Sequence, residues 1–107
     1  MKARAVQFTP EAAAQTEAAD RWWRQNRSGS ADLFANELHS AIDLIARAPG
    51  TGRAYPSRAL PGVRRVPLHR TRFHVYYVQR EDPVVVVAVW SAVRGEGPPL
   101  TSLGGAR

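Results

Sequence analysis

The feature that most constrains the fold is an unbroken apolar run from Val84 to Trp90. Seven apolar residues are far too few to cross a membrane as a helix. The run is rich in β-branched valine, so it predicts a strand that is buried on both faces or nearly so. Such a strand needs partner strands beside it and cover above and below, and the rest of the chain must supply them.

A helix is expected just after the N-terminal segment. Thr9-Pro10-Glu11 places a capping hydroxyl, a proline at the first helical position and an acid near the positive end of the helix dipole. These signals predict a helix from Pro10 to about Asn26. One face of that helix carries residues at helical spacing, namely Ala12, Thr16, Ala19 and Trp23. Trp22 then falls at the rim, where an aromatic side chain is more often structural than an interface anchor.

A second helix is expected after the polar turn Arg27–Ser30. Ser30 is the predicted cap, with Asp32 in the first turn, and Pro49-Gly50 ends the helix. The stripe expected to face the core is Phe34, Leu38, Ala41, Ile42 and Ile45. Two such helices joined by a short turn predict an antiparallel hairpin.

The remaining patterns are those of strands. Residues 3–8 predict an N-terminal strand, residues 50–61 a loop, and residues 79–83 a turn. Val63–Leu68 predicts a strand that Pro67 confines to an edge or a bulge, and Arg72–Val78 predicts the next one. The fold class is therefore α+β. It has an N-terminal strand, an α-helical hairpin and a three-stranded antiparallel meander, in a single sheet with both helices on one face.

Length and composition limit the organisation of the chain. The 107 residues suit one domain, expected over residues 1–98, with a flexible Gly- and Pro-rich tail at 99–107. The absence of cysteine excludes disulfides, thiolate metal sites and a cysteine nucleophile. We expect no metal and no cofactor. No apolar stretch follows the two basic residues near the N-terminus, so we expect no signal peptide and a cytoplasmic location.

Charge is distributed unevenly along the chain. Residues 44–80 contain eight arginines and no acid, whereas the segments on either side each carry a net charge of −1. A preference for arginine codons explains fourteen arginines against one lysine, but it does not explain the missing acids. Such a concentrated field favours an anionic partner, which could be nucleic acid, a ribosome or an acidic protein segment.

The two faces of the strand at residues 72–78 differ. Phe73, Val75 and Tyr77 should face the helices, and the other set, Arg72, His74, Tyr76 and Val78, should lie on an open face. His74 is then either an ordinary surface histidine or a site residue that nearby cations keep neutral. Arg64 and Arg65 point to opposite faces, and one of them is expected to pair with Glu17 or Glu37 near the helices.

Four motifs follow the predicted hairpin in a fixed order. They are Pro49-Gly50-Thr51-Gly52-Arg53, Gly62-Val63-Arg64-Arg65, His74-Val75-Tyr76-Tyr77, and the Val84–Trp90 run followed by Arg94. No motif is specific alone. The ordered set covers residues 5–98 and resembles the ParE side of the ParE/RelE toxin superfamily.

The resemblance implies a toxin of a type II toxin–antitoxin system that inhibits bacterial growth. ParE-branch members poison DNA gyrase and are not known to cleave RNA, which implies a binding protein rather than an enzyme. RelE-branch members cut messenger RNA on the ribosome, which leaves an endoribonuclease as the alternative. A non-toxic binding module is a third possibility. The resemblance also implies a cognate antitoxin and a toxin–antitoxin hetero-oligomer, and we expect the antitoxin to have an acidic C-terminal segment.

Site residues follow by position. If the chain is a ribonuclease, the resemblance points to Arg65, His74 and Arg94, but Pro98-Pro99-Leu100 stands where such enzymes usually carry a tail tyrosine. The expected target-binding residues are Arg64, Arg65, His69, Arg70, Arg72, His74 and Arg94. The expected antitoxin-binding residues are Trp22, Arg53, Arg58, Arg70, Arg72 and Trp90.

Overall fold

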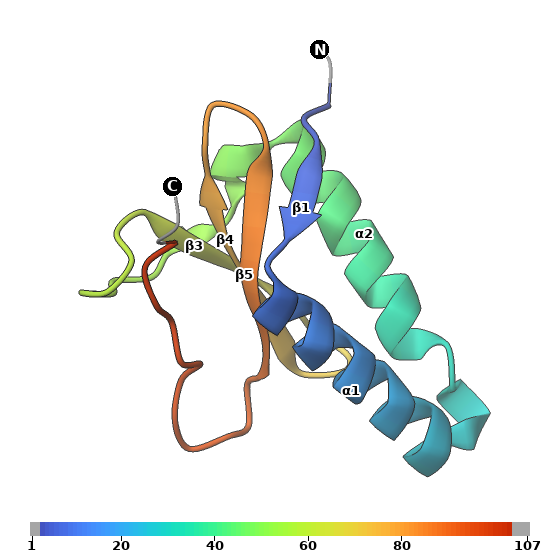
Figure 1. Ribbon diagram of the computed structural model, residues 1–107. Helices are drawn as coiled ribbons and strands as arrows, with labels where there is room; N and C mark the ends of the chain where they lie inside the picture. Colours follow the sequence, from blue (N-terminus) through green and yellow to red (C-terminus); the bar gives the residue numbers. More distant parts are fainter. Residues whose placement is uncertain (1–2, 104–107) are drawn as a thin grey trace.

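A computed structural model describes residues 3–103, which form one mixed sheet with two helices on one of its faces (Figure 1). The elements are β1 (Val6–Phe8), α1 (Pro10–Asn26), α2 (Leu33–Arg47), β2 (Arg53–Ala54), β3 (Val63–Leu68), β4 (Phe73–Gln79) and β5 (Val84–Ser91). Two short 3-10 turns, η1 (Ser28–Ser30) and η2 (Pro49–Thr51), follow α1 and α2. The α+β class predicted from the sequence is confirmed.

The strand order is β1-β5-β4-β3-β2. β3, β4 and β5 form the predicted antiparallel meander, and β5 lies between β4 and β1, which accounts for its apolar sequence. Two details differ from the prediction. β1 pairs with β5 in parallel, and the expected loop at residues 50–61 contains β2. β2 pairs with β3 only at Arg64 and Arg65, so no strand lies beside Pro67 on that side of β3. Proline, which has no N–H to donate, is therefore tolerated at this position.

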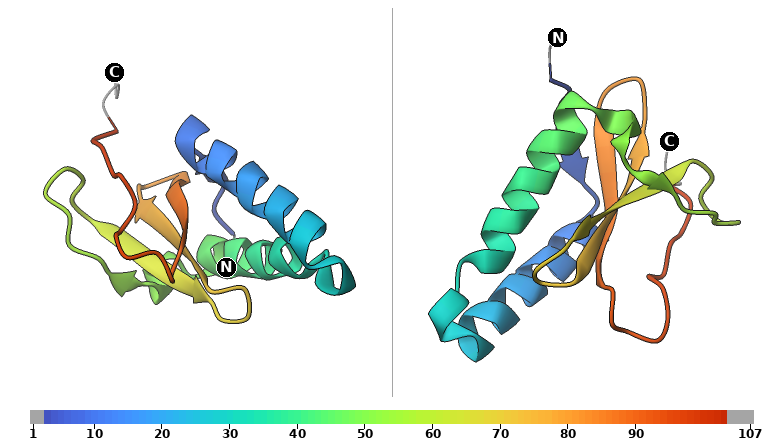
Figure 2. Two further views of the ribbon diagram at one scale, coloured as in Figure 1. Left: turned by 90° about the horizontal axis from the view of Figure 1, so that it is seen from below. Right: turned by 180° about the vertical axis from the view of Figure 1, so that it is seen from behind.

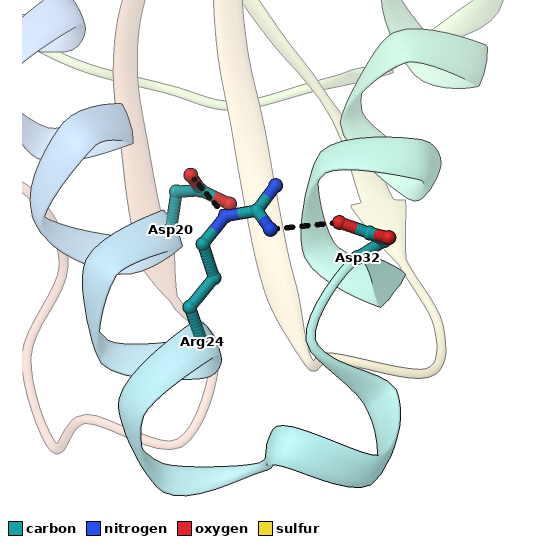
Figure 3. Close-up of polar contacts among 3 residues, drawn as sticks. All are labelled: Asp20, Arg24 and Asp32. Atoms are coloured by element: carbon teal, nitrogen blue, oxygen red, sulfur yellow. Dashed lines mark hydrogen bonds and ion pairs between the residues drawn. The ribbon is translucent and has the colours of Figure 1, made fainter.

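The helical hairpin forms largely as expected. Thr9 caps α1, because its side-chain oxygen accepts from the N–H of Ala12 at 3.1 Å. The predicted cap of the second helix is wrong. Ser30 lies in η1, and α2 begins at Leu33 without a side-chain cap. Asp32 instead accepts from Arg24 at 2.8 Å, and Arg24 also contacts Asp20 at 3.0 Å, so one guanidinium ties the end of α1 to the start of α2 (Figure 3).

The first face of the sheet is the one that the helices cover. Phe34 and Ile45 of α2 and Val75, Tyr77 and Val86 of the sheet are fully buried there. The predicted stripes of both helices point into this layer, with Trp23 packed at its edge. This layer is the main core, and it fixes the orientation of β4 and β5.

The second face, opposite the helices, is not open as the sequence predicted. Tyr76 and Val78 are buried in a second apolar cluster, which Tyr55 and Leu60 of the long loop and Leu100 and Leu103 of the C-terminal segment cover. Figure 2 shows this segment running along the side of the sheet away from the helices. Alternation placed apolar Val78 on this face, where it lies buried with Val87 of β5. Their burial requires a cover that periodicity could not identify.

The C-terminal tail was predicted to be flexible over residues 99–107. Residues 99–103 have no helix or strand, and the remaining four lie outside the described residues. The flexibility of the tail stays a prediction.

Candidate functional site

A groove of about 800 Å³ runs between α1, the β3–β4 turn and the end of β5. Trp22 and Trp23 of α1 and Trp90 of β5 line it, and we call it the tryptophan groove. Trp22 is 47% exposed and Val93, beside it in the lining, is 64% exposed. Large apolar side chains left in solvent beside a concave surface indicate a place where a partner packs.

Four arginines surround the tryptophan groove. Arg27 follows α1, Arg70 and Arg72 lie in the β3–β4 turn, and Arg94 follows β5. The described residues that line the groove include no acid. Two of these cations stack on its aromatic walls, Arg27 at 5.7 Å from the Trp22 ring and Arg94 at 4.3 Å from the Trp90 ring. The groove therefore suits a partner with both apolar and acidic side chains.

The β3–β4 turn is held in place from α2. The Glu37 carboxylate accepts from the backbone N–H of Arg70 at 2.8 Å, and from the N–H and hydroxyl of Thr71 at 2.9 and 2.7 Å. Arg72 follows with a φ of 66°, a left-handed conformation that arginine rarely adopts. Arg72 was predicted to begin the strand, but it lies in this turn, where its side chain faces the groove.

A second cluster of polar side chains lies on the second face, and we call it the Arg65–Tyr76 cluster. Arg65 of β3 lies 5.2 Å from the ring of Tyr55 and donates to the Tyr76 hydroxyl at 3.5 Å. Tyr55 and Tyr76 contact edge to face at 4.9 Å, and His74 lies 6.0 Å from Tyr76. Arg53 of β2 pairs directly with Arg65 on the neighbouring strand β3. Cations and aromatic rings thus lie together on this face.

The pKa shifts in this cluster have clear causes. Burial lowers the pKa of His74, and the charges of Arg65 and His69 lower it further. The sequence predicted this direction, but it attributed the shift to nearby charge, whereas burial contributes most. Burial raises the pKa of Tyr76 against the opposing effect of Arg65. At neutral pH the site therefore offers a neutral imidazole and a protonated phenol.

A third group of residues explains the Pro49–Arg53 motif. The buried Tyr77 hydroxyl donates to the Pro49 carbonyl at 2.7 Å and accepts from the Gly52 N–H at 2.8 Å. A Cβ at Gly52 would lie 2.6 Å from that hydroxyl, so only glycine fits. Arg64 donates to the Gly52 carbonyl at 2.7 Å. It lies on the helix side, opposite Arg65 as predicted, but neither arginine pairs with Glu17 or Glu37.

The structure divides the predicted target-binding residues. Arg70, Arg72 and Arg94 line the tryptophan groove, and Arg65 and His74 belong to the Arg65–Tyr76 cluster. Of the others, Arg64 supports the η2 turn, and His69 lies exposed between β3 and β4. Of the three catalytic candidates, Arg65 and His74 therefore lie in one cluster, and Arg94 stacks on Trp90, which pairs with His74 between β5 and β4.

The predicted antitoxin-binding residues divide as well. Trp22, Arg70, Arg72 and Trp90 all line the tryptophan groove. Arg53 lies in β2, at the far edge of the sheet, and Arg58 is exposed in the loop that covers the second face. Sequence reasoning missed the roles of Tyr55 and Glu37. Tyr55 follows an unpredicted strand, and Glu37 acts on backbone groups 33 and 34 residues away, which no local pattern reveals.

Within residues 3–103, the arginines of residues 44–80 form no salt bridge, although the Glu37 carboxylate that accepts from the Arg70 N–H also lies within range of the Arg70 charge. In the described part of the chain, the salt bridges join Arg24 to Asp20 and Asp32, and His39 to Asp43, all within the helical layer. No group of His, Asp or Glu in residues 3–103 could hold a metal ion. Within the same residues, no helix is long and apolar enough to cross a membrane. The chemistry available is thus that of unpaired cations beside aromatic rings.

Comparison with known proteins agrees with this architecture. Residues 6–94 match the family described as the ParE toxin of the type II toxin–antitoxin system parDE. Among solved structures, the fold is similar to a chain of the chromosomal ParDE system from P. aeruginosa, with a TM-score of 0.64 and 19% identity. That match covers 82% of this chain and 95% of the other. A search of curated proteins finds no match.

Proposed function

This chain belongs to the ParE toxin family of type II toxin–antitoxin systems, and from that membership we propose that it arrests bacterial growth by binding a protein target such as DNA gyrase. We further propose that a cognate antitoxin neutralises it by placing an acidic segment in the tryptophan groove. The observation that carries both proposals is that, within the described residues 3–103, the arginines of residues 44–80 form no salt bridge. Cations that no salt bridge pairs suit acidic partners.

The tryptophan groove is the proposed antitoxin site. It combines apolar walls, which provide affinity, with four arginines, which provide charge complementarity. The turn that carries Arg70 and Arg72 is already formed in the free chain. Glu37 holds the backbone of Arg70, and Arg72 has a left-handed conformation. A preorganised turn of this kind reduces the entropy lost on binding.

Toxicity is tested by expressing the chain alone in a bacterial host. The expected result is growth arrest with induction of the DNA-damage response, and co-expression of the protein encoded beside it should restore growth. A rapid block of translation without DNA damage would count against gyrase as the target. Unchanged growth would favour the non-toxic binding module.

The groove assignment needs its own variants. Replacing Arg70 and Arg72 together with glutamine should weaken binding of the purified neighbouring protein at least tenfold and reduce its salt dependence. Replacing Arg53 and Arg58 with glutamine is the matched control, because it removes the same charge from residues that do not line the groove. Equal losses in both pairs would place the antitoxin elsewhere.

The Arg65–Tyr76 cluster keeps one alternative open, a ribosome-dependent endoribonuclease. RNA cleavage through the 2′-hydroxyl needs a base, an acid and a cation, and His74, Tyr76 and Arg65 are groups of those types. Tyr76 is only 3% exposed, however, which weighs against direct contact with RNA. Transcript ends mapped during expression decide the question. Cuts at codons that disappear in His74→Ala or Arg65→Ala would establish the ribonuclease, and intact transcripts would exclude it.

A further inference from the structure

The C-terminal segment takes an unusual path over the sheet. After β5 the chain turns away from the sheet and then runs back along the second face, on the side opposite the helices (Figures 1 and 2). Pro98 is buried on this path, and Leu100 and Leu103 contact the second apolar cluster. Residues 95–103 therefore lie over the face that carries the Arg65–Tyr76 cluster.

The segment also makes close contact with that cluster. A Cβ built at Gly97 would lie 2.5 Å from the Tyr55 hydroxyl, so the backbone passes against the hydroxyl end of this side chain. Tyr55 in turn contacts both Arg65 and Tyr76. Any ligand that approached Arg65 and Tyr76 across this ring would meet the segment first.

The attachment of this segment is weak for its length. Within residues 3–103, a single hydrogen bond joins residues 95–103 to the rest of the chain, from the Trp90 indole N–H to the Glu96 carbonyl at 3.0 Å. Little hydrogen bonding to the rest of the chain is one mark of a unit that opens without global unfolding. Gly95 and Gly97 flank the bonded residue and leave the backbone free to turn.

Trp90 connects this attachment to the tryptophan groove. Its ring lines the groove and lies beneath Arg94, while its N–H holds Glu96. A movement of this one side chain therefore affects both surfaces. Arg94 directly precedes the segment, so its stacking on Trp90 fixes the point at which the segment leaves the sheet.

We propose that residues 95–103 are a lid over the Arg65–Tyr76 cluster, that Gly95 and Gly97 are its hinge, and that Trp90 is its latch. In the closed state the lid buries Tyr76 and shields Arg65. In the open state an aromatic and cationic surface becomes available on the second face. Because the latch lines the tryptophan groove, a partner that packs against Trp90 there holds the lid closed.

Thiol labelling of two neighbouring positions tests the lid. The chain has no cysteine, so each variant carries one thiol. Val87→Cys places it beneath the lid, since Val87 lines a small cavity together with residues 99–103. Val86→Cys places it beneath the helices, where the side chain is fully buried. We expect Val87→Cys to react at least tenfold faster, because it needs only lid opening, whereas Val86→Cys needs opening of the main core.

Two further substitutions test the latch and the fit of the lid. Trp90→Phe removes the N–H and keeps an aromatic ring, and Gly97→Ala forces a Cβ against Tyr55. Each should accelerate labelling of Val87→Cys several-fold and leave Val86→Cys unchanged. Gly29→Ala is the matched control, because nothing lies within 4 Å of a Cβ there, and it should change neither rate.

The result that overturns the lid is equal labelling of Val87→Cys and Val86→Cys. Equal acceleration of both by Trp90→Phe and Gly97→Ala would also overturn it, because it would mean that the second face opens only when the whole domain unfolds. The measurement uses the purified chain and needs neither toxicity nor an antitoxin. A failure here leaves the proposed function untouched, and a failure of the proposed function leaves the lid testable.

Discussion

The two faces of the sheet share the same strands but differ in what covers them. On the first face, α-helices cover an apolar layer in which Phe34 and Phe73 contact edge to face at 5.1 Å. On the second face, irregular segments cover a layer with a similar contact, Tyr55 to Tyr76 at 4.9 Å. The aromatic geometry is nearly the same, and in the second layer Arg65 also lies over the Tyr55 ring.

The two kinds of cover are expected to differ in local stability. Helices satisfy their own backbone hydrogen bonds and bury a continuous apolar stripe, so they make a lasting cover. Irregular segments with few hydrogen bonds cover a surface more loosely and at lower local stability. The sheet thus has one face that forms the main core and one face that carries Arg53, Arg65 and His74, with the tryptophan groove at the edge beside α1.

The largest expected effect concerns the two aromatic pairs. Phe34→Ala should lower the free energy of unfolding by about 3–5 kcal/mol, because it leaves a cavity beneath the helices. Tyr55→Ala should lower it by only about 1–2 kcal/mol, since its ring is partly exposed and its loop can adjust. Chemical denaturation at neutral pH measures both. Equal losses would mean that the second face is as firmly packed as the first.

The adjacent tyrosines of β4 give a sharper version of this comparison. The Tyr77 hydroxyl makes two short hydrogen bonds in the core, so Tyr77→Phe should cost about 1–3 kcal/mol by leaving buried backbone groups unpaired. The Tyr76 hydroxyl has one long contact with Arg65 at 3.5 Å, so Tyr76→Phe should cost less than about 1 kcal/mol. A larger loss of unfolding free energy in Tyr76→Phe than in Tyr77→Phe would mean that the second face is the more firmly packed of the two.

The first face could be predicted from the sequence because its signals are local and periodic. The stripe of Phe34, Leu38 and Ile45, the Thr9 cap and the alternation along β4 all repeat at helical or strand spacing. Ser30 does not cap α2, because it lies in η1 and α2 begins only at Leu33. Asp32, at the cap position, binds Arg24 instead, an ion pair between residues that helical periodicity does not connect.

The second face and the groove were only partly predictable. Trp22, Arg70, Arg72 and Trp90 were expected at one interface, and they do line one groove, since the hairpin and the meander bring their elements together. The cover over Tyr76 was not foreseen. Neither Tyr55 nor residues 98–103 have any periodic pattern, and their placement depends on contacts between residues far apart in sequence.

The pH dependence of stability should show one step from each face. On the second face, burial and the charge of Arg65 lower the pKa of His74 below 6.5, so the unfolded chain binds that proton first. Stability is therefore complete above pH 6.5 and falls as the pH drops towards the folded-state pKa. His74→Gln should remove this step in urea unfolding measured between pH 7 and pH 5. A wild-type profile that is flat in this range would contradict the assignment.

Glu37 provides the step on the other side of the sheet. Burial acts to raise the pKa of its carboxyl, but the hydrogen bonds from Arg70 and Thr71 and the charge of Arg70 outweigh burial and lower the pKa below 4.5. Its contribution to stability should be complete above pH 4.5 and be lost as the pH falls further. Glu37→Gln should flatten the profile below pH 4.5 and leave the His74 step in place. Persistence of the acid step in Glu37→Gln would assign it to another carboxyl group.

The smallest expected effect is the response of stability to salt. The change in unfolding free energy at low salt should differ in sign between a variant of the helical layer and a variant of the second face. Arg24 in the helical layer has two carboxylate partners, so Arg24→Ala should destabilise the chain slightly at low salt, and the loss should shrink as salt screens the pairs.

Arg65 faces Arg53 across β2 and β3. Like charges at opposed positions repel, and Arg65→Met keeps an apolar stem against Tyr55. Arg65→Met should therefore be neutral or stabilising at low salt and less favourable at high salt. Unfolding free energies measured for both variants in 20 mM and 1 M NaCl decide the point. If both variants lose stability at low salt and recover at high salt, Arg65 must have a counter-charge, and the second face is not the unpaired cationic surface on which the proposed interactions depend.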